Sequence, residues 1–563
     1  MVALRTKTDQ RTYNNYLKER LQISPHMQTD KLGLKNGGVN FVMAMPDTPY
    51  GFWRSAGMHI VANEAAKVGC NIDFCYLPFP NVIEDARKEG LKTLFSNSSV
   101  GSADILALSI SNPSLIFNTF ELLKLSGIEF SRLSRRKPLV VAGHLGISNP
   151  APFEDYIDAF VIGDGDDAIK EIVSVFKQHE IKEQMYKNLA EIEGVYVPDL
   201  TERKYGHSGT LEDVIYRGHD KVRQRILSNL KDYRRASLMV KDEAFVFMDY
   251  SCKYKCGFCQ MSNLRGKYRP NAVDEIKRYL AEYDEMGVKD AVLAGASSTN
   301  YPKEGLAEIF SWAKENLKAT RPIIRSVRID DIEKIAPYLT QEYLHIAPET
   351  GTDSLRNKVL MKSIKNEEIM NNLETEITEK GIHDIRTYFI VGVPSETEND
   401  RMEYAGMLKV AAKEMDRCHG KGTIRVDMYP LMPQPGTPFE GFGTLGLAAF
   451  AKIREEFEKS VRSGLPDTVE FKLNPLNPLP HLLEALLNTG DKKSGELALR
   501  AYENGAGIES LKQECNSAGI PYEQHVPRGN WHTKPWNMIE FVNSKYLDRQ
   551  KLALLQGLAD RNI

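Results

Sequence analysis

The sequence predicts an α/β protein in which a Rossmann-like domain is followed by a (β/α)6 partial TIM barrel and a mainly helical C-terminal region. Apolar segments of strand length alternate with amphipathic helical segments in two separate series, which is the pattern of parallel sheets covered on both faces. A charged, irregular stretch separates the two series, so each series is expected to form its own domain. At about 150 residues per domain, 563 residues leave room for roughly three or four domains.

The first series predicts a polar lead-in over residues 1–36 and an open α/β domain over residues 37–180. Its strands are "VNFVMAMP" (39–46), "NIDFCYLP" (71–78), "ADILALSIS" (103–111), "KPLVVAGH" (137–144) and part of "YIDAFVIGDGD" (156–166), with helices such as "MHIVANEAAKVG" between them. An open parallel sheet binds its ligand beyond the carboxyl ends of its strands. We therefore expect a ligand site in the loops that leave these strands.

Residues 181–240 are expected to form a connector, and residues 241–440 the barrel. The six barrel strands are "EAFVFMDYS", "DAVLAGAS", "RPIIRSVRID", "YLHIAPET", "RTYFIVGVP" and "GTIRVDMYP", most of them followed by a helical stretch. The chemistry of such barrels belongs at the carboxyl ends of the strands. A proline-rich break, "LNPLNPLP", lies within the last region, residues 441–563, where helices predominate.

Composition and charge exclude several classes of protein. With 73 basic and 76 acidic residues and a net charge of −3, wholesale attraction to nucleic acid or to an anionic membrane is not expected. Seven cysteines in a chain of this length, an odd number, do not form a disulfide scaffold and are typical of a reducing compartment. The N-terminus lacks the apolar core of a signal peptide, and no window reaches the roughly 18 apolar residues of a membrane helix. We expect a cytoplasmic protein.

Three of the seven cysteines lie within eight positions, in "SCKYKCGFCQ" at the end of the first barrel strand. Cys252, Cys256 and Cys259 have the spacing C-x3-C-x2-C, and three thiolates on one loop can hold three irons of a cubane. A zinc site would need a fourth ligand, but the neighbouring histidines are as far away as His219 and His345. Iron–sulfur ligation is the favoured interpretation, with zinc and a cluster of free thiols as the alternatives.

This cysteine motif, with the aromatic Phe258 before its third cysteine, closely resembles that of the radical S-adenosylmethionine (SAM) enzymes. The resemblance implies a [4Fe–4S] cluster on the three cysteines and SAM bound through its amino and carboxylate groups to the fourth iron. In that family, electron transfer from the cluster cleaves SAM to a 5′-deoxyadenosyl radical, or SAM serves as a methyl donor. The barrel is then a radical SAM barrel.

The resemblance extends with less force to residues that would seat SAM. They are Glu349 in "HIAPETG", the backbone of Val391, Gly392 and Val393 in "YFIVGVPSET", and Arg325, Ser326 or Arg328 after "RPII". The glycine-glycine-glutamate sequence that is common after the second strand in the family is replaced here by "AGASSTN". Backbone groups and Ser297 or Ser298 would have to receive the SAM ammonium instead.

An α/β domain in front of such a barrel resembles the cobalamin-binding branch of the superfamily, so the N-terminal domain is expected to be of the B12-binding type. The residues that would surround cobalamin and its nucleotide tail are Ser109, Ser111, Gly143, His144, Gly163, Asp164 and Gly165. The Asp-x-His-x-x-Gly motif that supplies a cobalt ligand in other cobalamin proteins is missing from "PDTPYGFWRSAGM", where Arg54 or Trp53 could face the corrin instead. The domain either binds cobalamin or has kept only the fold.

These resemblances imply a radical SAM enzyme, with cobalamin-dependent methylation of an unactivated carbon as the leading expectation. The alternative is a rearrangement, a cyclisation or an RNA modification without methyl transfer and without cobalamin. Methylthio transfer is disfavoured because the N-terminal domain lacks an additional cysteine triad, and a non-catalytic iron–sulfur protein leaves the SAM-like strand ends unexplained. The expected partners are a small-molecule or peptide substrate and an electron donor such as flavodoxin or ferredoxin.

Overall fold

The computed structural model describes residues 29–49, 55–226, 239–240, 243–325, 327–338 and 343–561, together with residues 14, 15 and 18. The chain divides into two compact units. The first comprises residues 1–241, 486–518 and 529–542, and the second comprises residues 242–485, 519–528 and 543–563. Residues 441–563 are therefore shared between the units. The domain boundaries expected from the sequence stay a prediction.

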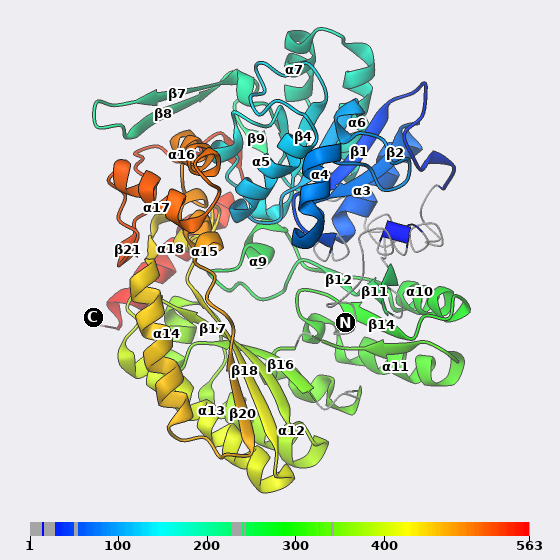
Figure 1. Ribbon diagram of the computed structural model, residues 1–563. Helices are drawn as coiled ribbons and strands as arrows, with labels where there is room; N and C mark the ends of the chain where they lie inside the picture. Colours follow the sequence, from blue (N-terminus) through cyan, green and yellow to red (C-terminus); the bar gives the residue numbers. More distant parts are fainter. Residues whose placement is uncertain are drawn as a thin grey trace. The chain divides into compact units, whose positions relative to one another are not determined.

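A six-stranded sheet forms the centre of the first unit (Figure 1), with the strand order β2-β1-β3-β4-β5-β6. The strands are β1 (Asn40–Met45), β2 (Asn71–Tyr76), β3 (Ile105–Ser109), β4 (Leu139–Gly143), β5 (Ala159–Val161) and β6 (Val195–Tyr196). All neighbouring pairs are parallel except β5 and β6. Every residue of β2 and β3 is buried, which explains why their sequences are mostly apolar, and the polar Asn71 and Asp73 of β2 are buried with the rest. The predicted Rossmann-like sheet is confirmed.

The first unit also contains helices from distant parts of the chain. They are α3 (Ala56–Lys67), α4 (Ile83–Glu89), α5 (Ile116–Leu125), α6 (Asp166–Gln178), α7 (Lys182–Ala190), α16 (Lys492–Glu503) and α17 (Ile508–Ser517). Helices α3 and α6 pack against each other, and α16 packs against α5. The contact with α16 includes Phe120 and Tyr502, whose ring centroids are 5.4 Å apart. C-terminal helices thus complete the core of the N-terminal unit.

Short strands complete the first unit. The hairpin β7 (Thr201–Tyr205) and β8 (Leu211–Tyr216) follows β6, and β9 (Val222–Arg223) pairs in parallel with β22 (Ile539–Glu540). Because β22 lies more than 300 positions after β9 in the sequence, the tail of the chain returns to the connector. This long-range pairing left no local pattern in the sequence.

The second unit contains two four-stranded sheets, ordered β10-β11-β14-β15 and β16-β17-β18-β20. The strands are β10 (Met239–Val240), β11 (Glu243–Phe247), β14 (Asp290–Ala294), β15 (Arg321–Ile323), β16 (Tyr343–Glu349), β17 (Asp384–Val391), β18 (Gly422–Pro430) and β20 (Val469–Leu473). The six predicted barrel strands are all present, and their pairs are parallel. Within the described residues, β15 and β16 do not pair, so the strands form two sheets rather than one continuous sheet.

Helices α10 (Val273–Glu285), α11 (Lys303–Asn316), α12 (Asn366–Lys380) and α13 (Glu398–His419) come after the strands β11, β14, β16 and β17 in the chain. Between β15 and β16 the structure has the short 3-10 segments η10 (Ile329–Lys334) and η11 (Ala336–Tyr338) in place of an α-helix. Three C-terminal helices belong wholly or mainly to the second unit: α14 (Leu447–Arg462), α15 (Pro478–Leu487) and α18 (Ser544–Ala559). The expected C-terminal helices are confirmed.

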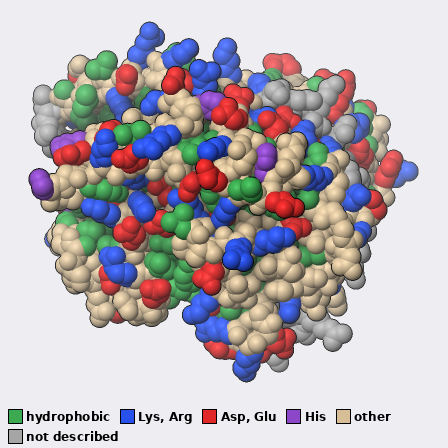
Figure 2. All heavy atoms as spheres, turned by 90° about the horizontal axis from the view of Figure 1, so that it is seen from above, with side chains coloured by type: hydrophobic (Ala, Val, Ile, Leu, Met, Phe, Trp, Pro, Cys, Tyr) green, Lys and Arg blue, Asp and Glu red, His purple; other side chains and the backbone are tan. Residues whose placement is uncertain are grey.

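The surface agrees with the balanced charge of the sequence. On the face drawn in Figure 2, acidic and basic side chains are interspersed and do not form a broad field of one sign. No helix in the described parts of the chain is both long enough and apolar enough to cross a membrane.

Candidate active site

The cysteine loop begins where the first barrel strand ends. After β11 the chain forms the two-residue strand β12 (Asp249–Tyr250), which pairs with β13 (Arg269–Pro270), and then turns at Ser251 with a φ of +70°. Between the second and third cysteines, the Gly257 N–H donates to the Leu360 carbonyl at 2.9 Å. The loop is therefore tied to both sides of its own unit, at the strand ends where barrel chemistry is expected.

The short helix α9 (Gln260–Leu264) fixes the loop from behind. The Asn263 side-chain amide donates to the carbonyls of Cys256 at 3.0 Å and Cys259 at 2.8 Å, and the Ser262 hydroxyl contacts the same two carbonyls. Gln550 on α18 in turn donates to Asn263 Oδ1 at 2.9 Å. Because side chains hold the loop carbonyls, the loop does not depend on a bound ligand for all of its order.

The three thiols are partly buried, and no disulfide joins them. Burial raises the pKa of Cys256 to about 12, although Lys362 and Arg328 act in the opposite direction, and burial also raises the pKa of Cys259. A metal must therefore displace the thiol protons when it binds. Among the described residues, no three Cys, His, Asp or Glu side chains converge as a single metal ion requires. A cubane places each thiolate on a different iron, so three separated thiols on one loop fit it better than they fit zinc.

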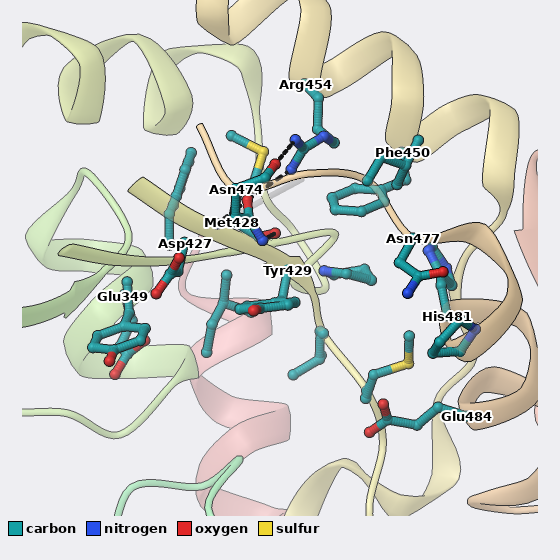
Figure 3. Close-up of a pocket in the computed structure, with 18 of the residues that line it drawn as sticks. Glu349, Asp427, Met428, Tyr429, Phe450, Arg454, Asn474, Asn477, His481 and Glu484 are labelled. Atoms are coloured by element: carbon teal, nitrogen blue, oxygen red, sulfur yellow. Dashed lines mark hydrogen bonds between the residues drawn. The ribbon is translucent and has the colours of Figure 1, made fainter. Parts of the chain in front are cut away.

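A cavity of about 730 Å³ lies beside the cysteine loop in the second unit, and Figure 3 shows the side chains that line it. Phe258 and Glu349 are both in its wall. The wall also includes Tyr388 of β17, Asp427 and Tyr429 of β18, Phe450 and Arg454 of α14, and Asn477, His481 and Glu484 at or near α15. In Figure 3, Glu349 lies on the opposite side of the cavity from His481 and Glu484. Elements from before and after the predicted barrel boundary thus enclose one space.

Glu349 occupies a strained position at the end of β16, with a φ of +69°. The pairing of β16 with β17 shifts register between Ile346 and Glu349, and this irregularity turns the strand end. The Glu349 carboxylate accepts from Lys362 Nζ at 2.9 Å, and both side chains are nearly buried. Glu349 lines the cavity, and its contact with SAM stays a prediction.

The turn after β17 is held by a buried carboxylate that the sequence did not reveal. The Gly392 N–H, at a φ of +72°, donates to Glu396 Oε2 at 2.6 Å, and the Glu396 N–H donates to the Val393 carbonyl at 2.8 Å. The Val391 carbonyl accepts from the Leu431 N–H at 2.8 Å. Burial raises the pKa of Glu396 to about 7. Backbone groups expected to read adenine are therefore engaged within the chain, and the neighbouring residue Ile390 lines the cavity.

The arginines expected after β15 are not equivalent. Arg328 is buried, donates to both oxygens of Asp330 at 3.1 and 2.7 Å, and lies 3.6 Å above the ring centre of Tyr254. Arg328 also donates a hydrogen bond to the Ser363 carbonyl at 3.1 Å. Its N–H donors are therefore engaged in contacts within the protein. Arg325 is half-buried and is not part of the cavity wall, and Ser326 lies outside the described residues.

The serines that replace the family's glutamate are turned toward their own segment. The Ser297 hydroxyl bonds with the Thr299 hydroxyl at 2.9 Å, and the Ser298 hydroxyl donates to the Leu293 carbonyl at 3.3 Å. Beside them lies Asp249, which is 5% exposed and whose two carboxylate oxygens lack a well-formed hydrogen bond. Burial raises the pKa of Asp249 to about 7, while hydrogen bonds from the Ala296 N–H and the Tyr268 hydroxyl and the charge of Lys253 act in the opposite direction. Sequence reasoning missed Asp249, although its place three positions before Cys252 was a usable signal.

The predicted cobalamin residues lie at the carboxyl edge of the first sheet. Ser109 pairs with Gly143 at the ends of β3 and β4, and Gly165 precedes α6. His144 is exposed, and its Nδ1 accepts from the Gly146 N–H at 3.0 Å. Ser111 and Asp164 are half-buried in the same loops, whereas Arg54 and Trp53 lie outside the described residues.

Packing within the chain explains why position 163 of the glycine-rich loop is a glycine, without a bound ligand. The connector crosses it, because the Arg225 N–H donates to the Ile162 carbonyl at 2.9 Å and the Asp164 N–H donates to the Arg225 carbonyl at 3.1 Å. A methyl group on Gly163 would lie only 2.0 Å from the Arg225 carbonyl oxygen. The chain's own backbone thus lies against Gly163 and gives this glycine a packing role, while its contact with cobalamin stays a prediction.

Two family models match the chain. Residues 57–198 match the model described as "Radical SAM proteins, N-terminal", and residues 249–408 match the model described as "Radical SAM superfamily". The second match contains the cysteine loop and also Glu349 and Val391–Val393. The two matches are separated by the connector and cover different units of the structure.

Several curated proteins are similar to parts of the chain. The uncharacterized protein MJ0966 of Methanocaldococcus jannaschii is 23% identical over 62% of this chain and 71% of that protein. The ribosomal protein uS12 methylthiotransferase RimO of Trichodesmium erythraeum is 28% identical over 35% of this chain and 44% of its own length. A tRNA-2-methylthio-N(6)-dimethylallyladenosine synthase of Clostridium tetani is 27% identical over 30% and 39%. The chain thus spans less than half the length of these two modifying enzymes.

Among solved structures, the radical SAM methyltransferase TsrM of Kitasatospora setae, with cobalamin and a [4Fe–4S] cluster bound, matches 72% of this chain and 74% of its own. The sequence identity is 13% and the TM-score is 0.47. A likeness of this degree decides neither the cofactor nor the reaction.

Proposed function

On the premise that residues 249–408 form a radical SAM domain behind the N-terminal domain of such proteins, we propose that this chain is an enzyme that reductively cleaves S-adenosylmethionine. Its substrate is a small molecule or the side chain of a peptide, bound in the cavity of about 730 Å³. The observation that carries the proposal is the position of the cysteine loop. Phe258, which lies between the second and third cysteines, is part of the cavity wall.

Each part of this site has a role in the proposal. Cys252, Cys256 and Cys259 hold the [4Fe–4S] cluster, which supplies the electron that cleaves SAM. Glu349, kept in place by Lys362, faces the bound SAM. Tyr388, Tyr429 and Phe450 offer apolar ring surface to the substrate, and Asp427, His481 and Glu484 offer polar contacts. A cavity with such a mixed lining can orient one substrate and exclude water from a reactive radical.

The cluster also requires a source of electrons and a compartment that keeps it reduced. We infer that a flavodoxin or ferredoxin is the electron donor and that the cytoplasm is the location. The odd number of cysteines, none of them in a disulfide within the structure, is consistent with a reducing compartment.

Cobalamin-dependent methyl transfer to an unactivated carbon is the second candidate. It is favoured by the place of Ser109, Gly143 and His144, which lie together at the carboxyl edge of an open parallel sheet. It is disfavoured by the connector over Gly163. We therefore rank radical chemistry without cobalamin, such as a rearrangement, a cyclisation or an RNA modification, above it.

Methylthio transfer, the reaction after which several similar proteins are named, is a less favoured reaction. It would require a further set of cysteines in the N-terminal unit, in addition to the loop at 252–259. Cys70, Cys75 and Cys515 are buried there, and burial raises the pKa of Cys70 to about 11 and that of Cys515 to about 12. Such thiols behave as small apolar side chains rather than as ligands.

The test is anaerobic reconstitution with iron and sulfide, followed by incubation with SAM and dithionite. We expect a brown protein with about four irons per chain that forms 5′-deoxyadenosine. Formation of S-adenosylhomocysteine in addition would favour methyl transfer. A reconstituted, reduced protein that yields neither product would refute the proposal. The remaining interpretation would be a non-catalytic iron–sulfur protein.

A further inference from the structure

The cysteine loop lies in a basic segment of an otherwise balanced chain. Residues 250–273 contain five basic and no acidic side chains, whereas the whole chain has 73 basic and 76 acidic residues. A run of charge forms one surface only if the fold brings its side chains together. The five side chains, which we call the basic collar, are Lys253, Lys255, Arg265, Lys267 and Arg269.

The fold brings the two halves of the basic collar together. Strand β12, just before the cysteines, pairs with β13, which begins at Arg269. The Ser251 hydroxyl donates to the Gly266 carbonyl at 3.0 Å. Both arginines contact one ring, because the guanidinium carbons of Arg265 and Arg269 lie 5.2 and 4.5 Å from the ring centre of Tyr250. The segment after helix α9 therefore lies beside the start of the cysteine loop.

The basic collar is accessible and lies outside the substrate cavity. Its three lysines are exposed, and its two arginines are half-buried. None of the five side chains belongs to the wall of the cavity beside the cysteine loop. The collar is therefore a surface of the cysteine loop that a ligand in the cavity does not occupy.

The charge of the lysines is not fully cancelled within the protein. Lys255 Nζ donates to the Ser262 carbonyl at 2.7 Å, and a carbonyl group does not neutralise an ammonium. Asp331 lies 3.7 Å from Lys253 Nζ, but this carboxylate is also paired with Lys334. The collar thus keeps positive charge that a partner with surface carboxylates can complement.

We propose that the basic collar is the docking surface for the protein that reduces the cluster, and that this partner is an electron carrier with an acidic surface. The inference rests on the proposed function, because it takes Cys252, Cys256 and Cys259 as the cluster ligands. A carrier must come close to the cluster, since electron transfer slows steeply with distance. Lys253 and Lys255 lie between two of the ligands in the chain. Positive charge at this place attracts an acidic carrier and orients it toward the loop.

The step that this docking serves is the transfer of one electron for each SAM molecule that is cleaved. The carrier is oxidised by one electron, which passes through the cluster to the sulfonium of SAM. The bond between the sulfur and the 5′ carbon breaks, and the products are methionine and a 5′-deoxyadenosyl radical. The electron cancels the positive charge of the sulfonium, so atoms and charge balance. The collar sets how often a reduced carrier reaches the loop and takes no part in the bond cleavage.

Nucleic acid is a less suitable partner for this surface. Single strands are held by positive charge together with aromatic rings on which their bases stack. The aromatic side chains of this segment are engaged elsewhere. Tyr250 contacts the two arginines of the collar, and Arg328 lies over the ring of Tyr254. The Tyr268 hydroxyl donates to a backbone carbonyl at 2.9 Å, and Phe258 lines the cavity. An acidic protein surface needs only the charge.

The experiment compares two ways of reducing the same protein. Full-length protein, reconstituted anaerobically, is incubated with SAM and with either dithionite or an acidic flavodoxin that has been reduced beforehand. The initial rate of 5′-deoxyadenosine formation is measured, with flavodoxin below saturation so that the rate reports on association. Dithionite is a small reductant that needs no docking surface.

Two triple variants remove the same amount of charge from different places. The collar variant combines Lys253→Gln, Lys255→Gln and Lys267→Gln. The matched control removes three exposed lysines from helices α11, α12 and α14 of the same unit, by Lys314→Gln, Lys380→Gln and Lys459→Gln.

We expect the collar variant to lower the flavodoxin-driven rate about 10-fold at low salt and the dithionite-driven rate by less than about twofold. The control variant should stay within about twofold of the wild type with either reductant. Raising the salt to about 0.3 M should slow the flavodoxin reaction of the wild type more than that of the collar variant, because salt screens the attraction.

The inference is overturned if flavodoxin does not support the reaction of the wild type, or if it drives the collar variant and the wild type equally fast. It is also overturned if the rates with flavodoxin and dithionite fall together, or if the control variant loses as much as the collar variant. A collar variant that keeps its flavodoxin-driven rate but loses affinity for a single-stranded RNA of about 20 nucleotides would assign the surface to nucleic acid instead.

Two further outcomes are distinct from these. A wild type that forms no 5′-deoxyadenosine with dithionite would overturn the proposed function itself. If the collar variant fails to load iron, Lys267→Gln alone provides a second route, because this residue lies eight positions after the last cysteine. It should lower the flavodoxin-driven rate about two- to threefold and leave the dithionite-driven rate unchanged, and an unchanged flavodoxin-driven rate would count against the inference.

Discussion

At the carboxyl edge of the first sheet, the chain covers its own loops: Arg225 bonds across Gly163, and Gly146 packs so closely on the Ser111 carbonyl that a methyl group there would lie 2.0 Å away. At the strand ends of the second unit lie three thiols without a disulfide and a cavity of about 730 Å³. Both edges follow the rule that parallel sheets bind ligands beyond their carboxyl ends. The comparison shows that this rule locates the edge of a sheet where a ligand can bind. A candidate site at that edge is identified by available functional groups and an open cavity.

The largest effect is expected from Cys256→Ala. Removing one of the three cluster ligands should abolish both the iron–sulfur chromophore and the formation of 5′-deoxyadenosine, because the remaining two thiols cannot hold the cubane. Absorption spectra and iron analysis after reconstitution measure the first effect, and chromatography of the products measures the second. Cys515→Ala in the first unit is the matched control and should retain both. A Cys256→Ala protein that is still brown and active would contradict the assignment of Cys256 as a cluster ligand, and with it the contrast between the two sheet edges.

A large loss of stability is expected from Lys362→Met. The substitution leaves the nearly buried Glu349 carboxylate without its cation, and breaking such a pair costs about 3–5 kcal/mol. Urea unfolding measures the change in the free energy of unfolding. The double variant Lys362→Met with Glu349→Gln should recover part of the loss, since no buried charge is left unpaired. A single variant within about 1 kcal/mol of the wild type would mean that Glu349 is not buried as an ion pair.

A smaller loss of stability is expected from Gly163→Ala. This variant tests whether the connector packs tightly against the carboxyl edge of the first sheet. Its φ of +105° and the Arg225 carbonyl 2.0 Å from the added methyl group should together lower the free energy of unfolding by roughly 2–4 kcal/mol. Gly127→Ala separates the two causes, because Gly127 has a φ of +65° but nothing within 4 Å of an added methyl group. It should cost roughly 1 kcal/mol. Equal losses in the two variants would show that the connector does not press on Gly163.

The smallest effect is expected from hydroxocobalamin. Incubation during refolding or reconstitution, followed by desalting, should leave little corrinoid absorption with the protein, because the connector backbone bonds across Gly163, in one of the loops expected to surround cobalamin. Retention of about one cobalamin per chain would instead support methyl transfer and would make the two edges alike. Gly163→Ala serves as a comparison here: if cobalamin is bound beside this loop, the variant should lose it.

The sequence by itself determined the elements and the cluster loop. Strands such as β2 and β3 could be predicted because burial on both faces favours mostly apolar residues, and the order of strands and helices followed from that pattern. The cysteine loop could be predicted because its ligands lie within eight positions of one another. Glu349 could be placed at a strand end for the same local reason. Its partner Lys362, thirteen positions later, could not be predicted.

Only the tertiary structure decided which of the predicted residues are available to a ligand. Arg328 donates its hydrogen bonds to Asp330, and Gly163 is covered by Arg225, 62 positions later in the chain. Helix α16, from the C-terminal part of the sequence, packs in the first unit. Availability depends on what long-range packing brings to each polar group, and contacts between distant residues leave no periodic trace in the sequence.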